Sequence, residues 1–139
     1  MPDRDIVLAK SASVQKCLRR IREVTQLQPA SLDEMNIQDI FVLNLQRAVQ
    51  ASIDLATHVV SSENLGLADS VKGNFELLEK AGIIDKELSG RMQSMVGFRN
   101  IAVHDYQQLD LNILKAILQM RLRDPEDFYA QILSHFKIV

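Results

Sequence analysis

The chain has few of the residues that cross-link or interrupt small folds. Its 139 residues include one cysteine, five glycines, three prolines and no tryptophan. The single Cys17 excludes an intrachain disulfide and a cysteine metal cluster, and it fits a reducing compartment, where we expect it only to pack. No run approaches the roughly 20 apolar residues that cross a membrane, and no signal peptide precedes the first expected helix. We therefore expect a cytoplasmic protein without a membrane segment.

An excess of charge is also missing. The chain carries 16 lysines and arginines against 18 aspartates and glutamates, a formal net charge of -2. This balance excludes a strongly basic nucleic-acid-binding protein, so any contact with RNA must be local. Hydrophobic residues make up 47% of the chain, which is ordinary for a globular protein. We expect one domain over residues 1–139, long enough to bury a core.

The abundant residues, Leu, Ile, Ala, Gln, Glu, Lys and Arg, favour helix, and the apolar ones recur every three or four positions. Capping residues predict where helices begin. The expected helices run from Asp3 or Asp5 to about Thr25, from Leu32 or Asn36 to Ser62, from Asp69 or Ser70 to Ala81, from Asp85 onward, over 111–122, and from Asp124, with Pro125 as its first helical residue, to the end. Five or six helices with short connections predict an all-α, mostly antiparallel bundle.

Four cations lie within seven residues of the first expected helix, namely Lys16, Arg19, Arg20 and Arg22. Such a cluster is most often a solvated face. The alternative is a contact with an RNA backbone or an acidic partner. The sequence leaves both open.

Asp54 and His58 are four residues apart in the second expected helix and so project from one face. A carboxylate there can orient or charge an imidazole. One interpretation is a structural hydrogen bond between buried polar groups. The other is support for a reactive site formed elsewhere in the chain.

The most informative stretch is Gly97 to Tyr106, GFRNIAVHDY, whose polar residues Arg99, Asn100, His104 and Tyr106 we call the Arg–His motif. Arginine presents planar donors that match phosphate oxygens, and histidine transfers protons near neutral pH. Together they suggest phosphodiester chemistry. The competing interpretation of these four residues is a satisfied polar interface.

Helix geometry restricts how the motif can act. On an ideal helix Asn100 shares a face with His104, and Tyr106 lies nearly on the face of Arg99. Arg99 and His104, five residues apart, diverge by about 140°. They converge only if the helix is irregular, if Arg99 reaches around it, or if a second subunit contributes. Gly97 favours the first option, because glycine permits a bend or a close approach of another backbone.

The order Arg, four residues, His, one residue, Tyr resembles the motif of HEPN-domain ribonucleases and, among them, the HepT toxins of bacterial and archaeal toxin–antitoxin pairs. The resemblance extends over nearly the whole chain, through Ala51–Val60, Phe75–Ile84 and Leu88–Asn100. It implies a HEPN helical bundle that forms a two-fold homodimer, with both copies of the motif lining one cleft.

The resemblance also implies a type VII toxin that acts as a metal-independent endoribonuclease without a cofactor. His104 would remove the proton of an RNA 2′-hydroxyl, and Arg99 would stabilise the charge on the phosphate. Asn100 would either bind the phosphate or orient His104. DNA lacks the 2′-hydroxyl and should resist cleavage. No metal is expected, since the three histidines share no helix face.

Tyr106 corresponds to the residue that an MntA-like nucleotidyltransferase antitoxin modifies in HepT-like toxins by transferring AMP from ATP. The resemblance therefore predicts Tyr106 as an O-AMP-tyrosine that switches the toxin off, against the alternative of a packed tyrosine. A second function stays open: a non-catalytic helical partner, or substrate-binding subunit, of a nucleotidyltransferase. Cleavage of RNA by the isolated chain distinguishes the two.

Overall fold

Helices make up most of residues 1–138, the part of the chain that the computed structural model describes. The α-helices are α1 (Arg4–Thr25), α2 (Met35–Ser62), α3 (Val71–Lys80), α4 (Lys86–His104), α5 (Leu111–Met120) and α6 (Asp124–His135), with short 3-10 helices η1 (Pro29–Asp33) and η2 (Tyr106–Gln108). No strand occurs in these 138 residues. The predicted all-α class and the upper helix count are confirmed.

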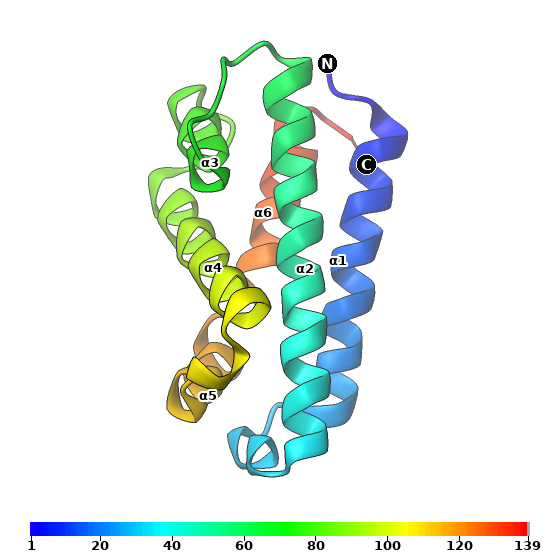
Figure 1. Cartoon of the computed structure of the whole chain (residues 1–139). Helices are drawn as coiled ribbons and strands as arrows, with labels where there is room; N and C mark the ends of the chain where they lie inside the picture. Colours follow the sequence, from blue (N-terminus) through cyan, green and yellow to red (C-terminus); the bar gives the residue numbers. More distant parts are fainter. Residues whose placement is uncertain (139) are drawn as a thin grey trace.

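The long helices α1 and α2 form an antiparallel pair that runs the length of the molecule (Figure 1). Asp3 caps α1, and its carboxylate accepts hydrogen bonds from the backbone N–H groups of Asp5 and Ile6. Its stripe of Val7, Val14, Leu18 and Ile21 is fully buried. Burial of a continuous apolar stripe on each helix stabilises the pair far more than helix propensity does.

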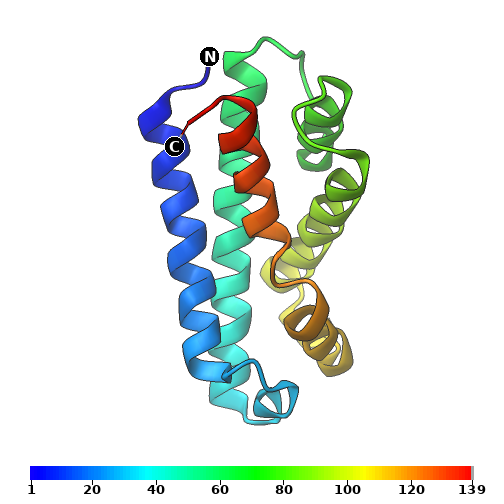
Figure 2. The ribbon, with the colours of Figure 1, turned by 180° about the vertical axis from the view of Figure 1, so that it is seen from behind.

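Helices α3, α4 and α6 pack against α2, and α5 packs against η1. Seen from behind, α6 lies over α2, with α1 on one side and α3 and α4 on the other (Figure 2). Phe75 of α3 and Phe128 of α6 meet edge to face with ring centroids 5.2 Å apart. Both rings are fully buried, so this contact joins the third and last helices through the core.

The start of α6 differs from the prediction. The helix begins at Asp124, Arg123 occupies the capping position, and no side chain caps the helix there. Asp124 is instead buried, with its carboxylate 3.9 Å from the guanidinium of Arg91 on α4. Burial raises the pKa of this carboxyl, while the charge of Arg91 opposes the shift. Asp124 therefore serves the α4–α6 interface, and its predicted role as N-cap was wrong.

Over residues 1–138, no helix combines the length and the apolar character that crossing a membrane requires.

Candidate functional site

The Arg–His motif occupies the last turns of α4 and the segment that follows. Asp85 caps α4, and its carboxylate accepts a hydrogen bond from the N–H of Leu88. Its buried residues, Leu88, Ser89, Met92, Met95, Val96, Phe98 and Ala102, hold it against the bundle. Asn100 and His104 remain exposed, and four residues apart on one helix they share a face, as predicted.

Arg99 and His104 are not brought onto one face within the chain. α4 continues without interruption from Lys86 to His104, so the divergence of about 140° stands. A Cβ atom at Gly97 would meet only the Nζ atom of Lys72, at 3.7 Å. The close backbone approach predicted at Gly97 is therefore absent within residues 1–138. An irregular helix therefore does not bring Arg99 and His104 together. Two options remain: Arg99 reaches around the helix, or a second subunit contributes.

The guanidinium of Arg99 has unused donor capacity. Its Nε atom is buried and has no hydrogen-bond partner among the described residues. Nearly all buried polar groups in folded proteins are paired, so an unpaired one calls for an explanation. Arginine binds phosphate through several parallel N–H groups, and an anion or a second chain at this position would satisfy the donor.

Tyr106 does not lie on the face of Arg99. The helix ends at His104, because Asp105 adopts a non-helical backbone conformation (φ −154°, ψ 62°), and Tyr106 begins η2. The prediction of a shared face assumed a helix through Tyr106 and was wrong. No glycine or proline marks this end of the helix, so local residues do not predict it.

The hydroxyl of Tyr106 donates a hydrogen bond of 2.5 Å to the carboxylate of Asp39, in the second turn of α2. Burial first, and then the hydrogen bond and charge of Asp39, raise the pKa of Tyr106 to about 12. The side chain nevertheless stays 40% exposed. Sequence reasoning missed Asp39, because nothing local connects residues 67 positions apart.

Asp54 and His58 bind other residues and not one another. Asp54 accepts from Lys10 at 3.1 Å and from Gln50 at 3.0 Å, while Nε2 of His58 accepts from the backbone N–H of Asp3 at 3.0 Å. The predicted pairing of carboxylate and imidazole is therefore wrong.

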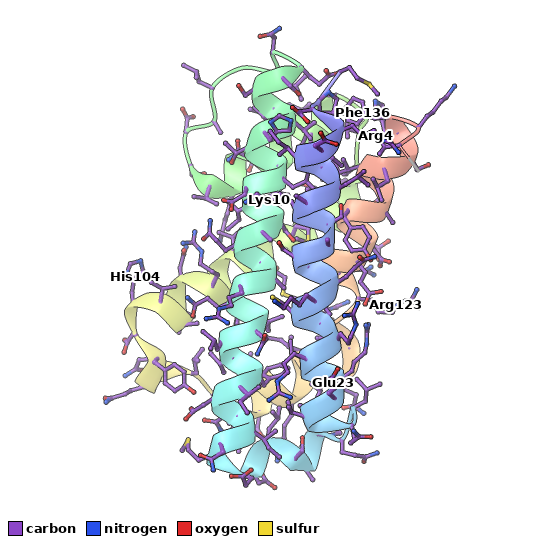
Figure 3. All side chains as sticks on the ribbon, turned by 90° about the vertical axis from the view of Figure 1, so that its right-hand side faces the viewer. Arg4, Lys10, Glu23, His104, Arg123 and Phe136 are labelled. Atoms are coloured by element: carbon purple, nitrogen blue, oxygen red, sulfur yellow. The ribbon has the colours of Figure 1, made fainter. Side chains whose placement is uncertain are left out.

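These two residues also lie far from Tyr106. Asp54 is 15 residues beyond Asp39, or about 22 Å along the axis of α2. In Figure 3, His104 lies at one edge of the molecule, well away from Lys10 on α1. The placement favours the structural interpretation of Asp54 and His58 over support for the Arg–His motif.

Two of the four clustered cations of α1 lie near a carboxylate, and three of the four line a groove. Arg22 pairs with Glu126 of α6, and Arg20 lies 3.7 Å from Glu23. Lys16 and Arg19 line a groove of about 810 Å³ between α1 and α2, together with Arg20 and with Arg47 of α2.

Cys17 also lines this groove and is half-buried. Burial raises the pKa of its thiol, and the charges of Arg47 and Lys16 act in the opposite direction. The raised pKa fits the inert packing that we expected of Cys17, since the thiolate is the reactive form.

No group of three histidine, cysteine, aspartate or glutamate side chains within residues 1–138 is placed to hold a metal ion.

Comparisons with known proteins support the sequence resemblance. Residues 14–132 match the family model described as Ribonuclease HepT-like. The chain is 40% identical over 124 residues to the mRNA nuclease HepT of Shewanella oneidensis. The matched residues cover 89% of this chain and 93% of that protein. It is also 28% identical over 96 residues to a putative RNase of Archaeoglobus fulgidus. That match covers 64% of this chain and 72% of the other protein.

Solved structures agree with the sequence matches. One is the tri-AMPylated HEPN toxin of Shewanella oneidensis in complex with an MNT antitoxin, with a TM-score of 0.88 and 38% identity over 94% of this chain and 98% of that one. Another is a toxin–antitoxin complex with AMP-PNP, with a TM-score of 0.87 and the same identity and coverage. The family match spans most of the chain, and the fold and the Arg–His motif accord with it. The chain therefore belongs to the HepT-like ribonuclease family.

Proposed function

We propose that this chain is the toxin of a toxin–antitoxin pair, an endoribonuclease that cleaves RNA and is neutralised by transfer of AMP to Tyr106. The observation that carries the proposal is the Arg–His motif at the end of α4, where His104 is exposed and Arg99 keeps a buried donor unpaired. The likeness to an mRNA nuclease and to an AMPylated HEPN toxin supports it. An mRNA substrate would place the activity in the cytoplasm.

The chemistry requires a base, an acid and a cation. His104 removes the proton of the 2′-hydroxyl, whose oxygen attacks the adjacent phosphorus, and the bond to the 5′-oxygen breaks. Arg99 stabilises the charge that develops on the phosphoryl oxygens. His104 of the partner subunit protonates the departing oxygen. The products are a 2′,3′-cyclic phosphate and a 5′-hydroxyl, and no step uses a metal ion.

A homodimer supplies what one chain lacks. Because Arg99 and His104 diverge on an unbroken α4, a two-fold axis near the end of this helix would bring two arginines and two histidines into one cleft. Asn100 shares the face of His104 and would bind the phosphate or orient the imidazole.

The partner that switches the toxin off is an MntA-like nucleotidyltransferase antitoxin. AMP attached to Tyr106 would place a phosphodiester two residues from His104, where it would repel RNA phosphates and fill a narrow cleft. The modified tyrosine would thus block the substrate without unfolding the protein.

The test uses the purified full chain and its antitoxin. Alone, the chain should cleave single-stranded RNA and leave the matching DNA intact. After incubation with antitoxin and ATP, intact mass should rise by whole AMP units and cleavage should stop. A chain that never cleaves RNA but is needed by the antitoxin for nucleotide transfer would instead be a non-catalytic subunit.

A further inference from the structure

The contact between Tyr106 and Asp39 has a use beyond holding η2 in place. It joins two side chains 67 residues apart, through a 2.5 Å hydrogen bond in which the phenol donates and the carboxylate accepts. The other tyrosine, Tyr129 on α6, makes no side-chain hydrogen bond among the described residues. The two tyrosines therefore differ in a feature that bears directly on reactivity.

A tyrosine that accepts AMP must lose its proton when its oxygen attacks phosphorus. With a pKa of about 12 for Tyr106, only about one molecule in 10⁵ carries the phenolate at pH 7. Attack by the neutral phenol therefore needs a base within hydrogen-bond reach of the proton. Asp39 is the carboxylate that already accepts a hydrogen bond from this phenol.

We propose that Asp39 is the toxin's own proton acceptor for the modification of Tyr106, so that the substrate protein supplies part of the transfer site. The inference rests on the proposed function. The Tyr106 oxygen bonds to the α-phosphorus of ATP, the bond from that phosphorus to the β-bridging oxygen breaks, and pyrophosphate leaves with the bonding pair. The phenolic proton passes to Asp39 and then to solvent.

The geometry suits this step. With its hydrogen directed at Asp39, the phenol oxygen keeps its lone pairs for the phosphorus, and its 40% exposure leaves the ring open to a docked enzyme. Asp39 also fixes the ring against α2, so the nucleophile is oriented before the antitoxin arrives. The same contact explains why Tyr106 rather than Tyr129 would be modified.

The experiment measures the initial rate of AMP incorporation against pH, with the antitoxin and ATP in excess. Asp39→Asn keeps the size of the side chain but not its basicity, and should slow transfer by about 10² to 10⁴ at neutral pH. The rate should recover as pH rises, because hydroxide replaces the missing base. Asp39→Glu, which retains a carboxylate, should fall between wild type and Asp39→Asn.

Glu76→Gln is the matched control, since it removes one charge from an exposed position on α3, and it should react at the wild-type rate. Cleavage of RNA by each unmodified variant reports that the fold is intact. Wild-type transfer with an unchanged pH profile in Asp39→Asn would overturn the role of Asp39 alone. Incorporation of AMP into Tyr106→Phe would overturn the acceptor assignment, and with it the proposed function of Tyr106.

An independent observation concerns the groove between α1 and α2. Lys16, Arg19 and Arg47 line it, and none has a carboxylate within 4.0 Å in the described chain. The charges of Lys16 on α1 and Arg47 on α2 both lower the pKa of the Cys17 thiol. Cations from two helices therefore lie near one point of the groove. This concentration of positive charge contrasts with the net charge of -2.

The carboxylates that line the groove do not cancel this charge. Glu23 lies 3.7 Å from Arg20, and Asp54 is bound by Lys10, so both are already engaged. Arg47 is eight residues beyond Asp39 on α2, or about 12 Å along the helix axis. A strand that reached the Arg–His motif beside Tyr106 would be close enough to continue into the groove.

We infer that this groove binds the phosphodiester backbone of the RNA that extends beyond the cleavage site. Cations spread along a groove attract successive phosphates without reading the bases. The groove would thus add affinity for long single strands and leave sequence preference unchanged. This inference also rests on the proposed function, because it assigns part of the substrate of the same nuclease.

The test compares two triple variants that remove three charges each. Lys16→Gln/Arg19→Gln/Arg47→Gln should raise KM for a long single-stranded RNA at least tenfold. Affinity should also depend less on salt: the slope of log K against log salt should become less steep by about two. Cleavage of a dinucleotide, too short to reach the groove, should be unchanged.

The control variant, Lys80→Gln/Lys86→Gln/Lys137→Gln, removes exposed cations outside the groove and should leave both substrates unaffected. If KM for the long RNA rose equally in the two triple variants, the effect would come from net charge alone, and the inference would be overturned. An unchanged KM for long RNA in the groove variant would also overturn the inference. If binding of the antitoxin weakened in that variant while KM stayed unchanged, the groove would bind the antitoxin and not RNA. A wild type that cleaved neither the long RNA nor the dinucleotide would count against the proposed nuclease, not the groove.

Discussion

Nε2 of His58 accepts a hydrogen bond of 3.0 Å from the backbone N–H of Asp3, the residue that caps α1. The contact ties the start of α1 to the last turns of α2. Removal of one partner of a typical protein hydrogen bond costs about 0.5 to 1.5 kcal/mol. We therefore expect His58→Ala to lower the free energy of unfolding by about 1 kcal/mol and to leave kcat/KM for RNA unchanged.

Denaturant unfolding and RNA cleavage on the same preparation check this prediction. Gln119→Ala is the control, since that side chain is exposed on α5 and makes no side-chain hydrogen bond among the described residues, so its removal should affect neither quantity. A large loss of cleavage in folded His58→Ala would favour the other interpretation, in which His58 supports the Arg–His motif.

The catalytic prediction concerns Arg99 and His104. Arg99→Ala removes the cation that stabilises the phosphoryl oxygens, and His104→Ala removes the base, so each should reduce cleavage by about 10² to 10⁴. Both proteins should stay folded and dimeric, as judged by circular dichroism and size-exclusion chromatography. Arg123→Ala removes an exposed cation outside the motif and should cleave normally. Wild-type cleavage by either motif variant would exclude this site.

Chelation tests the proposed chemistry. The mechanism uses His104, Arg99 and the hydroxyl of the RNA itself, so cleavage should proceed at the same rate in excess EDTA. The measurement is the initial rate with and without chelator, after dialysis of the enzyme. Loss of activity that magnesium or manganese restores would contradict a metal-independent reaction.

Alkaline pH should weaken the contribution of Tyr106 to stability. Its pKa is raised to about 12 in the fold, against about 10 in an unfolded chain. The folded state therefore favours the protonated phenol, and the stabilisation is complete below about pH 10 and lost as pH rises through 12. The difference in unfolding free energy between wild type and Tyr106→Phe should be constant to pH 10 and then shrink. A difference that widened above pH 10 would contradict the raised pKa.

Local rules predicted the helices well and the site only in part. Ser70 and Asp85 cap helices where the sequence predicts, because a cap depends on residues within one turn. The end of α4 at His104 carries no comparable signal.

Tertiary contacts were beyond the sequence. The spacing of Asp54 and His58 suggested that they bind one another, but helix spacing says only that two side chains share a face, and both bind other residues. Asp39 is an ordinary polar residue near the start of a helix. Its contact with Tyr106 exists because the bundle brings η2 back to α2.

A mixed dimer gives the sharpest test of a site shared between subunits. The Arg99→Ala homodimer lacks both arginines and the His104→Ala homodimer lacks both histidines, so both should be inactive. A dimer with one chain of each keeps one arginine and one histidine, on different chains. If the cleft combines residues across the two-fold axis, one of the two arrangements that the divergence on α4 leaves open, co-expression with two affinity tags should give a dimer that cleaves RNA at least ten times faster than either homodimer. Its rate should remain below wild type, because one histidine cannot serve as base and acid together. A mixed dimer as inactive as its parents would mean that Arg99 reaches the His104 of its own chain.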